Sequence, residues 1–257
     1  MKSKDDYINN IVNILHALES TQKIDELILK MQSNEIQLEF GKGGTNVSRG
    51  IYEYSLYDSL TVGGVSRGKI IKRITEKSKP TYIYYLYQGK LILIERLVED
   101  GETYTIEIIQ KGKQRETGIV YNIYGSLNEI IGMNIYLFND ENQYIYSERM
   151  ERVGDKQFDK YQEYVIYEGK LPINIIYRKR IKLVSSRKQK ALIEKLLNNK
   201  NIDNSKAIER MKKSKKRVVH ILYNENKVPI QYYFNNNIED IYELTKLEQQ
   251  YYKENFF

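Results

Sequence analysis

Residues 82–93, with the sequence YIYYLYQGKLIL, combine two apolar runs with a short polar turn between them. The β-branched and aromatic residues before Gln88 and after Lys90 favour extended strands. Gly89 supplies the positive φ that a tight hairpin turn requires. The stretch therefore predicts an antiparallel β-hairpin.

The same hairpin pattern occurs again further along the chain. Tyr84–Leu91 aligns without a gap with Tyr164–Leu171. A third copy, Tyr223–Ile230, aligns when one residue is inserted. Each copy predicts a strand that ends in tyrosine, a tight turn with Gly or Asn at positive φ, and a second strand. We expect Gly89 and Gly169 to occupy equivalent hairpin turns.

Between residues 36 and 182 the hydrophobic pattern has a period of two, interrupted by polar turns. The expected strands are Ile51–Leu60, Lys69–Ile74, Tyr82–Tyr87, Leu91–Leu97, Thr103–Ile109, Thr117–Tyr124, Met133–Phe138, Tyr144–Arg149, Tyr161–Tyr167 and Ile173–Lys182. Because no helix of useful length is expected between them, βαβ crossovers are not available and the sheet should be antiparallel. The predicted fold class is α+β, predominantly antiparallel β: a hairpin-repeat meander sheet with N-terminal helices and a basic C-terminal helical segment.

Helical patterns flank the predicted sheet. Residues 4–33 predict two short helices, the first capped by Ser3 with Asp6 and the second by Ser20 or Thr21. We expect one continuous domain made of four segments. These are an N-terminal helical segment (1–35), a β-meander (36–184), a basic helical insertion (185–217), and a final hairpin with a C-terminal helix (218–257).

The composition excludes several kinds of site. Cysteine is absent, which excludes disulfides, thiolate metal sites and thiol nucleophiles. The two histidines, His16 and His220, lie far apart, so a histidine-rich metal site is excluded as well. We expect no metal and no organic cofactor. The sequence also lacks a run resembling a signal peptide or a membrane span, so we expect a cytoplasmic protein with no membrane partner.

Motif searches give no catalytic residues. Gly41–Gly44 lacks the spacing of a phosphate-binding loop and is interpreted as a turn or bulge. Glu168 and Lys170, with Asp155 or Asp159 upstream, match half of a nuclease motif, but the repeat places them at a hairpin turn. His220 lies in an apolar run and is interpreted as a packed strand residue. We predict that the protein is not an enzyme, with a carboxylate-only active site as a further alternative.

Tyrosine is unusually frequent, with 24 tyrosines and no tryptophan. A tyrosine ring packs against cross-strand neighbours while its hydroxyl stays hydrated, so a broad sheet accounts for the number. A tyrosine-rich binding face is the alternative interpretation.

The strongest signal is a concentration of positive charge between Arg178 and Arg217. This stretch carries sixteen Lys and Arg against three carboxylates, a net charge of +13, so the rest of the +7 chain sums to −6. It could be a solvated face, a dock for an acidic protein, or a binding site for nucleic-acid phosphates. The predicted partner-binding residues are Arg187, Lys188, Lys190, Arg210, Lys212, Lys213, Lys215, Lys216 and Arg217.

Through the repeated Tyr84–Leu91 and Tyr164–Leu171 hairpins, the chain resembles bacterial polymorphic-toxin immunity proteins. The resemblance implies a non-enzymatic protein–protein recognition module, an antitoxin that binds and neutralises a cognate toxin domain. The basic character of this chain implies that such a toxin domain would be acidic. The alternative is a nucleic-acid-binding accessory protein that uses Arg178–Arg217 as its contact surface.

Overall fold

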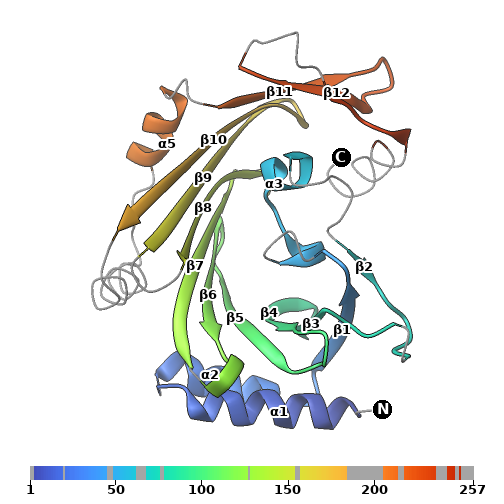
Figure 1. The fold of residues 1–257 in the computed structure, drawn as a ribbon, viewed down its shortest axis with the longest axis vertical. Coiled ribbons are helices and arrows are strands. Elements are labelled where there is room, and N and C mark those ends of the chain that lie inside the picture. The colour runs from blue at the N-terminus through green and yellow to red at the C-terminus, as the bar shows by residue number, and fades with distance from the viewer. Residues whose placement is uncertain are drawn as a thin grey trace. The chain divides into compact units, whose positions relative to one another are not determined.

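The computed structural model describes residues 3–19, 21–44, 49–61, 68–75, 78–126, 128–153, 157–183, 205–213, 217–235, 242–246 and 249. These residues form mostly antiparallel β-sheet, with a few helices (Figure 1). The strands are β1 (Ile36–Lys42), β2 (Lys69–Ile70), β3 (Tyr82–Tyr87), β4 (Lys90–Leu97), β5 (Thr103–Lys111), β6 (Arg115–Asn122), β7 (Glu129–Phe138), β8 (Tyr144–Val153), β9 (Gln157–Glu168), β10 (Leu171–Leu183), β11 (Val218–Tyr223), β12 (Pro229–Phe234) and β13 (Tyr242–Glu243). The helices are α1 (Lys4–Ala17), α2 (Gln22–Met31), α3 (Leu56–Thr61) and α5 (Ser205–Lys212), with 3-10 turns η1 (Gly50–Tyr52) and η2 (Tyr124–Ser126).

The strand order confirms the predicted meander. Within the described part of the chain, thirteen strands are hydrogen-bonded in the order β13-β12-β11-β10-β9-β8-β7-β6-β5-β4-β3-β1-β2. Neighbours in the sheet are therefore neighbours in the chain, except that β1 lies between β3 and β2. The strand pairs run antiparallel. For pairs joined by short hairpins, such as β3–β4 and β9–β10, the connection requires this direction.

The chain divides into two compact units, each assembled from separate stretches of sequence. Unit 1 comprises Met1–Glu53, Ser66–Lys111 and Gly118–Ile131. Unit 2 comprises Tyr54–Val65, Gly112–Thr117 and Gly132–Phe257.

In unit 1, α1 and α2 form where the sequence predicts them. The Ser3 hydroxyl accepts a hydrogen bond from the Asp6 amide at 3.1 Å, and the Asp6 carboxylate accepts one from the Ser3 amide at 2.6 Å. This is the expected capping box. Thr21 caps α2 by accepting from the Ile24 amide. The periodicity of the two helices predicts apolar stripes of Tyr7, Ile11, Ile14, Leu15 and Leu18 in the first and of Ile24, Leu27, Ile28 and Met31 in the second. The second stripe is buried in full. In the first, Ile11, Leu15 and Leu18 are buried and Tyr7 and Ile14 are half-buried, while Val12 is buried as well.

The core of the unit 1 sheet is built around tyrosines. Tyr82, Tyr84 and Tyr85 of β3 are fully buried, and each hydroxyl has a hydrogen-bond partner. Tyr84 donates to the Arg49 carbonyl oxygen and accepts from the Ile51 amide, which fixes η1 against the sheet. Because a buried hydroxyl must be satisfied, these contacts explain why η1 is a tight turn rather than part of a strand.

Two of the predicted strands are wrong. Ile51–Leu60 forms η1 and α3 instead of a strand, because Ser55 caps α3 by accepting from the Asp58 amide at 3.1 Å. Lys69–Ile74 pairs with β1 only over Lys69 and Ile70. The Ile71 amide still donates to the Phe40 carbonyl, but the chain then bends away from β1.

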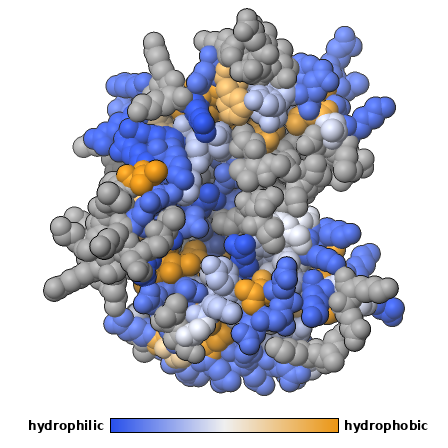
Figure 2. Space-filling view, in the orientation of Figure 1, coloured by the Kyte–Doolittle hydropathy of each residue, from blue (hydrophilic) through white to orange (hydrophobic). Residues whose placement is uncertain are grey.

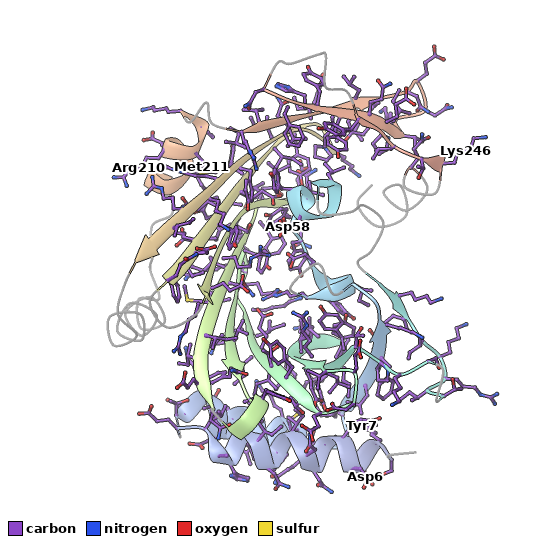
Figure 3. The ribbon with its side chains drawn as sticks, viewed as in Figure 1. Asp6, Tyr7, Asp58, Arg210, Met211 and Lys246 are labelled. Carbon is purple, nitrogen blue, oxygen red and sulfur yellow. The ribbon has the colours of Figure 1, made fainter. Side chains whose placement is uncertain are left out.

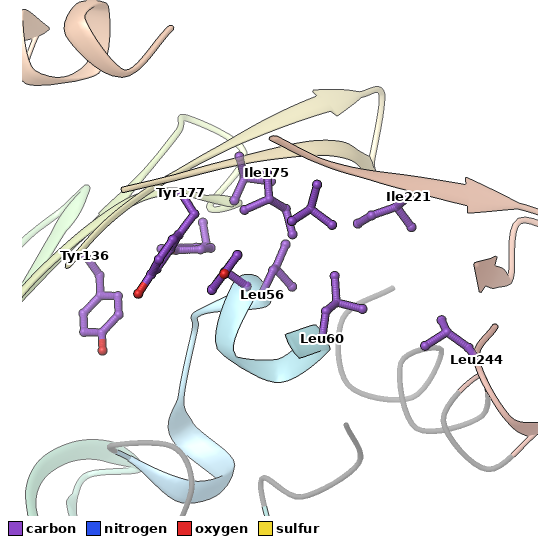
Figure 4. Packing of buried hydrophobic residues seen from close by; sticks show 11 residues of the cluster. Leu56, Leu60, Tyr136, Ile175, Tyr177, Ile221 and Leu244 are labelled. Atoms are coloured by element: carbon purple, nitrogen blue, oxygen red, sulfur yellow. The ribbon is translucent and has the colours of Figure 1, made fainter. Parts of the chain in front are cut away.

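Unit 2 is centred on α3 and the long strands β8, β9 and β10. Leu56 and Leu60 of α3 pack against buried residues of β10, β11 and the segment that follows β13, as Figure 4 shows. The cluster consists of Leu56, Tyr57, Leu60, Tyr136, Tyr144, Val165, Ile175, Tyr177, Val219, Ile221 and Leu244. The Tyr57 and Tyr177 rings stack with their centroids 3.6 Å apart. A sheet face therefore closes over α3 through aliphatic and aromatic contacts.

Gly89 and Gly169 both occupy antiparallel hairpin turns, as predicted, but the turns differ by one residue. Gln88 and Gly89 both have positive φ between the paired residues Tyr87 and Lys90, as a type I′ turn requires. In the second hairpin Glu168 pairs with Leu171, and Gly169 takes the first loop position. Glycine suits either position, so one sequence pattern supports two turns.

The third copy of the repeat does not form a tight turn. The loop runs from Asn224 to Val228, and the residue with positive φ is Lys227 rather than Gly or Asn. The Asn224 side chain accepts hydrogen bonds from the amides of Asn226 and Val228 at 3.0 Å each. This side chain organises the longer loop, which accounts for the inserted residue in the alignment.

Replacing Gly89 by alanine should lower the free energy of unfolding by about 1 kcal/mol, because φ is 72° there and an added Cβ would meet nothing within 4 Å. Gly89→Asn is the matched control, since asparagine tolerates positive φ better than alanine. We expect about half the loss for asparagine in urea unfolding. If both variants lost the same free energy of unfolding, the loss could not come from the positive φ at Gly89 alone.

Candidate functional site

A basic surface forms where α5 packs against the sheet of unit 2. Met211 of α5 is buried against Tyr146 and Ile176, with Ile208 beside it. Arg210 points away from the sheet, whereas Met211 points toward it (Figure 3). The apolar side of α5 is therefore used in packing, and its cationic side remains exposed.

The strand register places two arginines of β10 on the face that α5 covers. Arg178 and Arg180 follow Ile176 at intervals of two residues, so the three side chains lie on one face of the sheet. Burial and the neighbouring guanidinium groups of Arg180 and Arg210 lower the pKa of Arg178. Burial is the larger cause, and the contribution of the two guanidinium groups reflects repulsion among neighbouring cations.

We define the basic surface as Arg178, Arg180, Arg210, Lys212 and Lys213. Four of the five side chains are exposed, and Arg178 is half-buried. Figure 2 shows mostly hydrophilic side chains over this region of α5 and β10. Lys212 places its ammonium 5.2 Å from the centroid of the Tyr164 ring, which fixes its position on the sheet.

A neighbouring carboxylate is already neutralised by another residue. Glu148 forms an ion pair with Lys160. Its Oε2 also accepts hydrogen bonds from the Tyr146 hydroxyl and the Gln162 amide group, both at 3.0 Å. Glu148 is therefore committed to the sheet. Against the five cations of the basic surface, α5 contributes one exposed carboxylate, Glu209.

The predicted partner-binding residues are only partly brought together. Arg210, Lys212 and Lys213 lie on or next to α5 and belong to the basic surface. Arg217 directly precedes β11 and donates a hydrogen bond to the Tyr57 hydroxyl at 3.0 Å, so it also stabilises the packing of α3. The remaining predicted residues, Arg187, Lys188, Lys190, Lys215 and Lys216, lie outside the described residues, as does most of the predicted basic helical segment.

The opposite face of β8–β10 carries an ion-pair network that the sequence did not predict. Arg149 donates to the Asp58 carboxylate at 2.8 Å, and its guanidinium lies 4.5 Å from the Tyr161 ring centroid. Lys179 pairs with Asp159 at 2.8 Å and lies 5.0 Å from the same ring. Tyr161 therefore lies close to two cations, each paired with a carboxylate.

The Asp159 carboxylate is a buried member of this network. Its side chain is 3% exposed. Burial raises the pKa of Asp159, but hydrogen bonds from Lys179, Gln157 and Tyr161 outweigh it and leave that pKa below the usual range. The carboxylate is thus held ionised as a structural partner of Lys179.

Glu163 is enclosed beneath the first turn of α3. Its Oε2 lies 2.6 Å from the Ser55 hydroxyl, and its Oε1 accepts from the Leu56 amide at 3.0 Å. Burial raises the pKa of Glu163 to about 8. The side chain thus connects β9 to the start of α3 as a largely neutral acid at neutral pH, a role that positions α3.

The other sequence candidates do not form a catalytic site within the described residues. His220 of β11 stacks on Tyr233 with ring centroids 4.6 Å apart, and burial lowers the pKa of His220. Glu168 and Lys170 flank the exposed turn at Gly169, far along β9 from Asp159. Asp155 lies outside the described part of the chain. No group of three or more His, Cys, Asp or Glu side chains that could hold a metal ion occurs among the residues described.

Comparisons with known proteins add no functional assignment. No protein-family model matches the chain, and no curated protein matches it. In the described residues, none of the helices has the length and apolar character needed to cross a membrane.

Proposed function

We propose that the chain is a non-enzymatic protein–protein recognition module whose basic surface binds an acidic surface of a partner protein. The observation that carries this proposal is the convergence of Arg178, Arg180 and Arg210 from two separate elements. Bringing like charges together lowers stability unless something opposes it, and an acidic partner would relieve that repulsion.

A protein partner accounts for the basic surface better than nucleic acid does. Single-stranded nucleic acid is bound by exposed aromatic rings that stack on bases, but the nearby Tyr164 ring is covered by Lys212. Duplex DNA is read by a helix that enters a groove, whereas the apolar side of α5 is packed on the sheet. Arginines held on a rigid sheet suit bidentate contacts with carboxylates.

The resemblance to toxin immunity proteins suggests the form that this recognition takes. An immunity protein covers the active site of its toxin and needs no chemistry of its own. We propose that the partner is an acidic toxin domain, located in the cytoplasm with this chain. A gene for a large toxin beside the gene for this chain would support the immunity role, whereas replication or mobilisation genes would support nucleic-acid binding.

Charge reversal of the basic surface tests the proposal. The variant Arg180→Glu/Arg210→Glu/Lys213→Glu changes exposed residues, so the fold and melting temperature should stay close to those of the wild type. Tagged full-length protein, purified from its native cells with nuclease treatment, should retain an acidic partner that the variant loses. With the partner purified, association should slow as salt rises while dissociation changes less.

The control variant Lys90→Glu/Lys113→Glu/Lys170→Glu makes the same charge change at exposed positions outside the basic surface and should keep the partner. Binding to a generic duplex oligonucleotide is measured in parallel by fluorescence anisotropy. The proposal would be overturned in favour of nucleic acid if the wild-type protein bound the oligonucleotide with submicromolar affinity at physiological salt. Reversal of the basic surface would also have to abolish this binding, and the control variant would have to keep it.

A further inference from the structure

Strand β1 of unit 1 has an incompletely paired edge. On one side it pairs with β3 from Ile36 to Gly41. On the other side, the recorded pairing with β2 covers only Gly41 and Lys42, followed by the bond from the Ile71 amide to the Phe40 carbonyl. Within the described residues, the Ile36–Glu39 part of β1 has no strand beside it on that side.

The backbone groups of Leu38 point toward this open edge. In an antiparallel sheet, both backbone groups of one residue point to the same side, and alternate residues share that side. The Phe40 carbonyl accepts from Ile71 on the β2 side, so the amide and carbonyl of Leu38 face that side too. An unpaired edge of this kind is a template for another strand.

The open edge borders a groove rather than a flat surface. The groove has a volume of about 550 Å³ and lies between the start of α1, the outer edge of β1 and the segment that follows β2. The segment after β2 is fixed in its bent course, because Ser78 donates from its hydroxyl to the Arg73 carbonyl and accepts from the Thr75 amide. We call this cavity the edge groove.

The lining of the edge groove combines apolar and cationic side chains. Tyr7 and Phe40 pack with ring centroids 5.4 Å apart beside Leu38 (Tyr7 is labelled in Figure 3). Lys4 on one flank and Lys72 and Arg73 on the other are exposed, and the described residues that line the groove include no carboxylate. The lining therefore favours an extended chain with apolar side chains on one face and acidic groups in reach of the cations.

We propose that the edge groove binds an extended acidic peptide segment of a partner protein, which adds to β1 as an edge strand. Main-chain hydrogen bonds to Leu38 supply affinity, the Tyr7–Phe40 side of the groove receives an apolar side chain, and the flanking cations select acidic residues. The four residues Ile36–Glu39 span about 14 Å at roughly 3.4 Å per residue, enough for a short strand. This site is separate from the basic surface and does not depend on the proposed function.

The test uses the full-length protein and a short labelled peptide of alternating valine and glutamate, with blocked ends. Fluorescence anisotropy should show saturable binding in the micromolar range. Hydrogen exchange at the amides of residues 36–40 should slow when the peptide is bound. The variant Lys72→Glu/Arg73→Glu should weaken binding at least about tenfold, whereas the control Lys90→Glu/Lys170→Glu should not change it.

A peptide N-methylated at the valine amides separates strand addition from simple charge attraction. It keeps every carboxylate but blocks main-chain pairing, so we expect at least about a tenfold loss of affinity. Reversal of the basic surface should leave peptide binding unchanged, which makes failure here distinguishable from failure of the proposed function. Three results would each overturn the proposal. They are no binding by the unmodified peptide, equal affinity of the N-methylated peptide, and unchanged peptide affinity of the variant Lys72→Glu/Arg73→Glu.

Discussion

Replacing Glu163 by alanine is expected to lower the free energy of unfolding by about 3–5 kcal/mol. The variant removes the group that contacts the Ser55 hydroxyl and accepts from the Leu56 amide, both in a buried setting. The start of α3 then loses its connection to β9. Because α3 carries Leu56 and Leu60 into the core of unit 2, we expect a shift in the urea midpoint rather than a local change.

Glu163→Gln is the informative partner of this variant. The Ser55 hydroxyl donates to one carboxyl oxygen of Glu163, and the other oxygen accepts from the Leu56 amide. A glutamine amide keeps both contacts when its carbonyl oxygen accepts from Leu56 and the Ser55 hydroxyl rotates to accept from its nitrogen. We expect a loss of less than about 1 kcal/mol at pH 7, against the larger loss for alanine.

The pH dependence of stability provides a separate measurement. The pKa of Glu163 is about 8 in the folded protein, above its ordinary value of 4.5. The stabilisation from its bound proton is fully present below pH 4.5 and is lost as the pH rises toward 8. The wild-type free energy of unfolding should therefore fall, relative to Glu163→Gln, by up to about 1.4 kcal/mol per pH unit in this window. If the free energies of unfolding of the wild type and Glu163→Gln changed in parallel with pH, the raised pKa could not belong to Glu163. A loss of stability in Glu163→Gln as large as in Glu163→Ala would contradict the role of Glu163 as a neutral acid.

The sheet could be predicted from sequence because its signals are local. Alternating β-branched and aromatic residues, separated by turn residues, predict strands and hairpins without reference to distant contacts. The helix Lys4–Ala17 was predictable for the same reason, since Ser3 and Asp6 form its capping box within one turn. The one-residue shift between the turns at Gly89 and Gly169 was not predictable, because glycine fits both turn types.

The run Ile51–Leu60, which contains α3, was mistaken for a strand because Tyr52, Tyr54 and Leu56 alternate with polar residues. The signal that could have identified it is Ser55 followed three residues later by Asp58, a helix-start pattern. The contact that completes the helix start comes from Glu163, 108 residues further along the chain. Tertiary contacts of this range override local β-propensity and leave no trace in a single sequence.

The candidate site was predictable only as an excess of charge. The sequence located the positive charge between Arg178 and Arg217, but it did not show that Arg178, Arg180 and Arg210 converge. The network on the other face was missed, since Arg149 and Asp58 lie 91 residues apart. The edge groove depends on where β2 ends, which is set by bends at Lys72 and Arg73 rather than by composition.

Breaking the ion pair between Arg49 and Glu107 should have the other large effect on stability, in unit 1. Arg49 is fully buried, and its Nε lies 2.9 Å from Oε1 and 3.0 Å from Oε2 of Glu107. Gly118 leaves room for the pair, because a Cβ at that position would lie 1.7 Å from Glu107 Oε1. The bidentate contact and the glycine beside it indicate a site shaped around the two charges.

Arg49→Met and Glu107→Leu should each lower the free energy of unfolding by about 3–5 kcal/mol, because each leaves one buried charge without this partner. The double variant Arg49→Met/Glu107→Leu removes both charges and replaces them with apolar side chains of similar length. It should therefore lose less stability than either single variant, so the coupling energy in a double-mutant cycle should be at least about 3 kcal/mol. Urea unfolding of the four proteins at one pH measures that energy. If the stability losses of the two single variants were additive in the double variant, or if each were below about 1 kcal/mol, the ion pair would behave like a surface contact. Arg49 would then be held by its other neighbours.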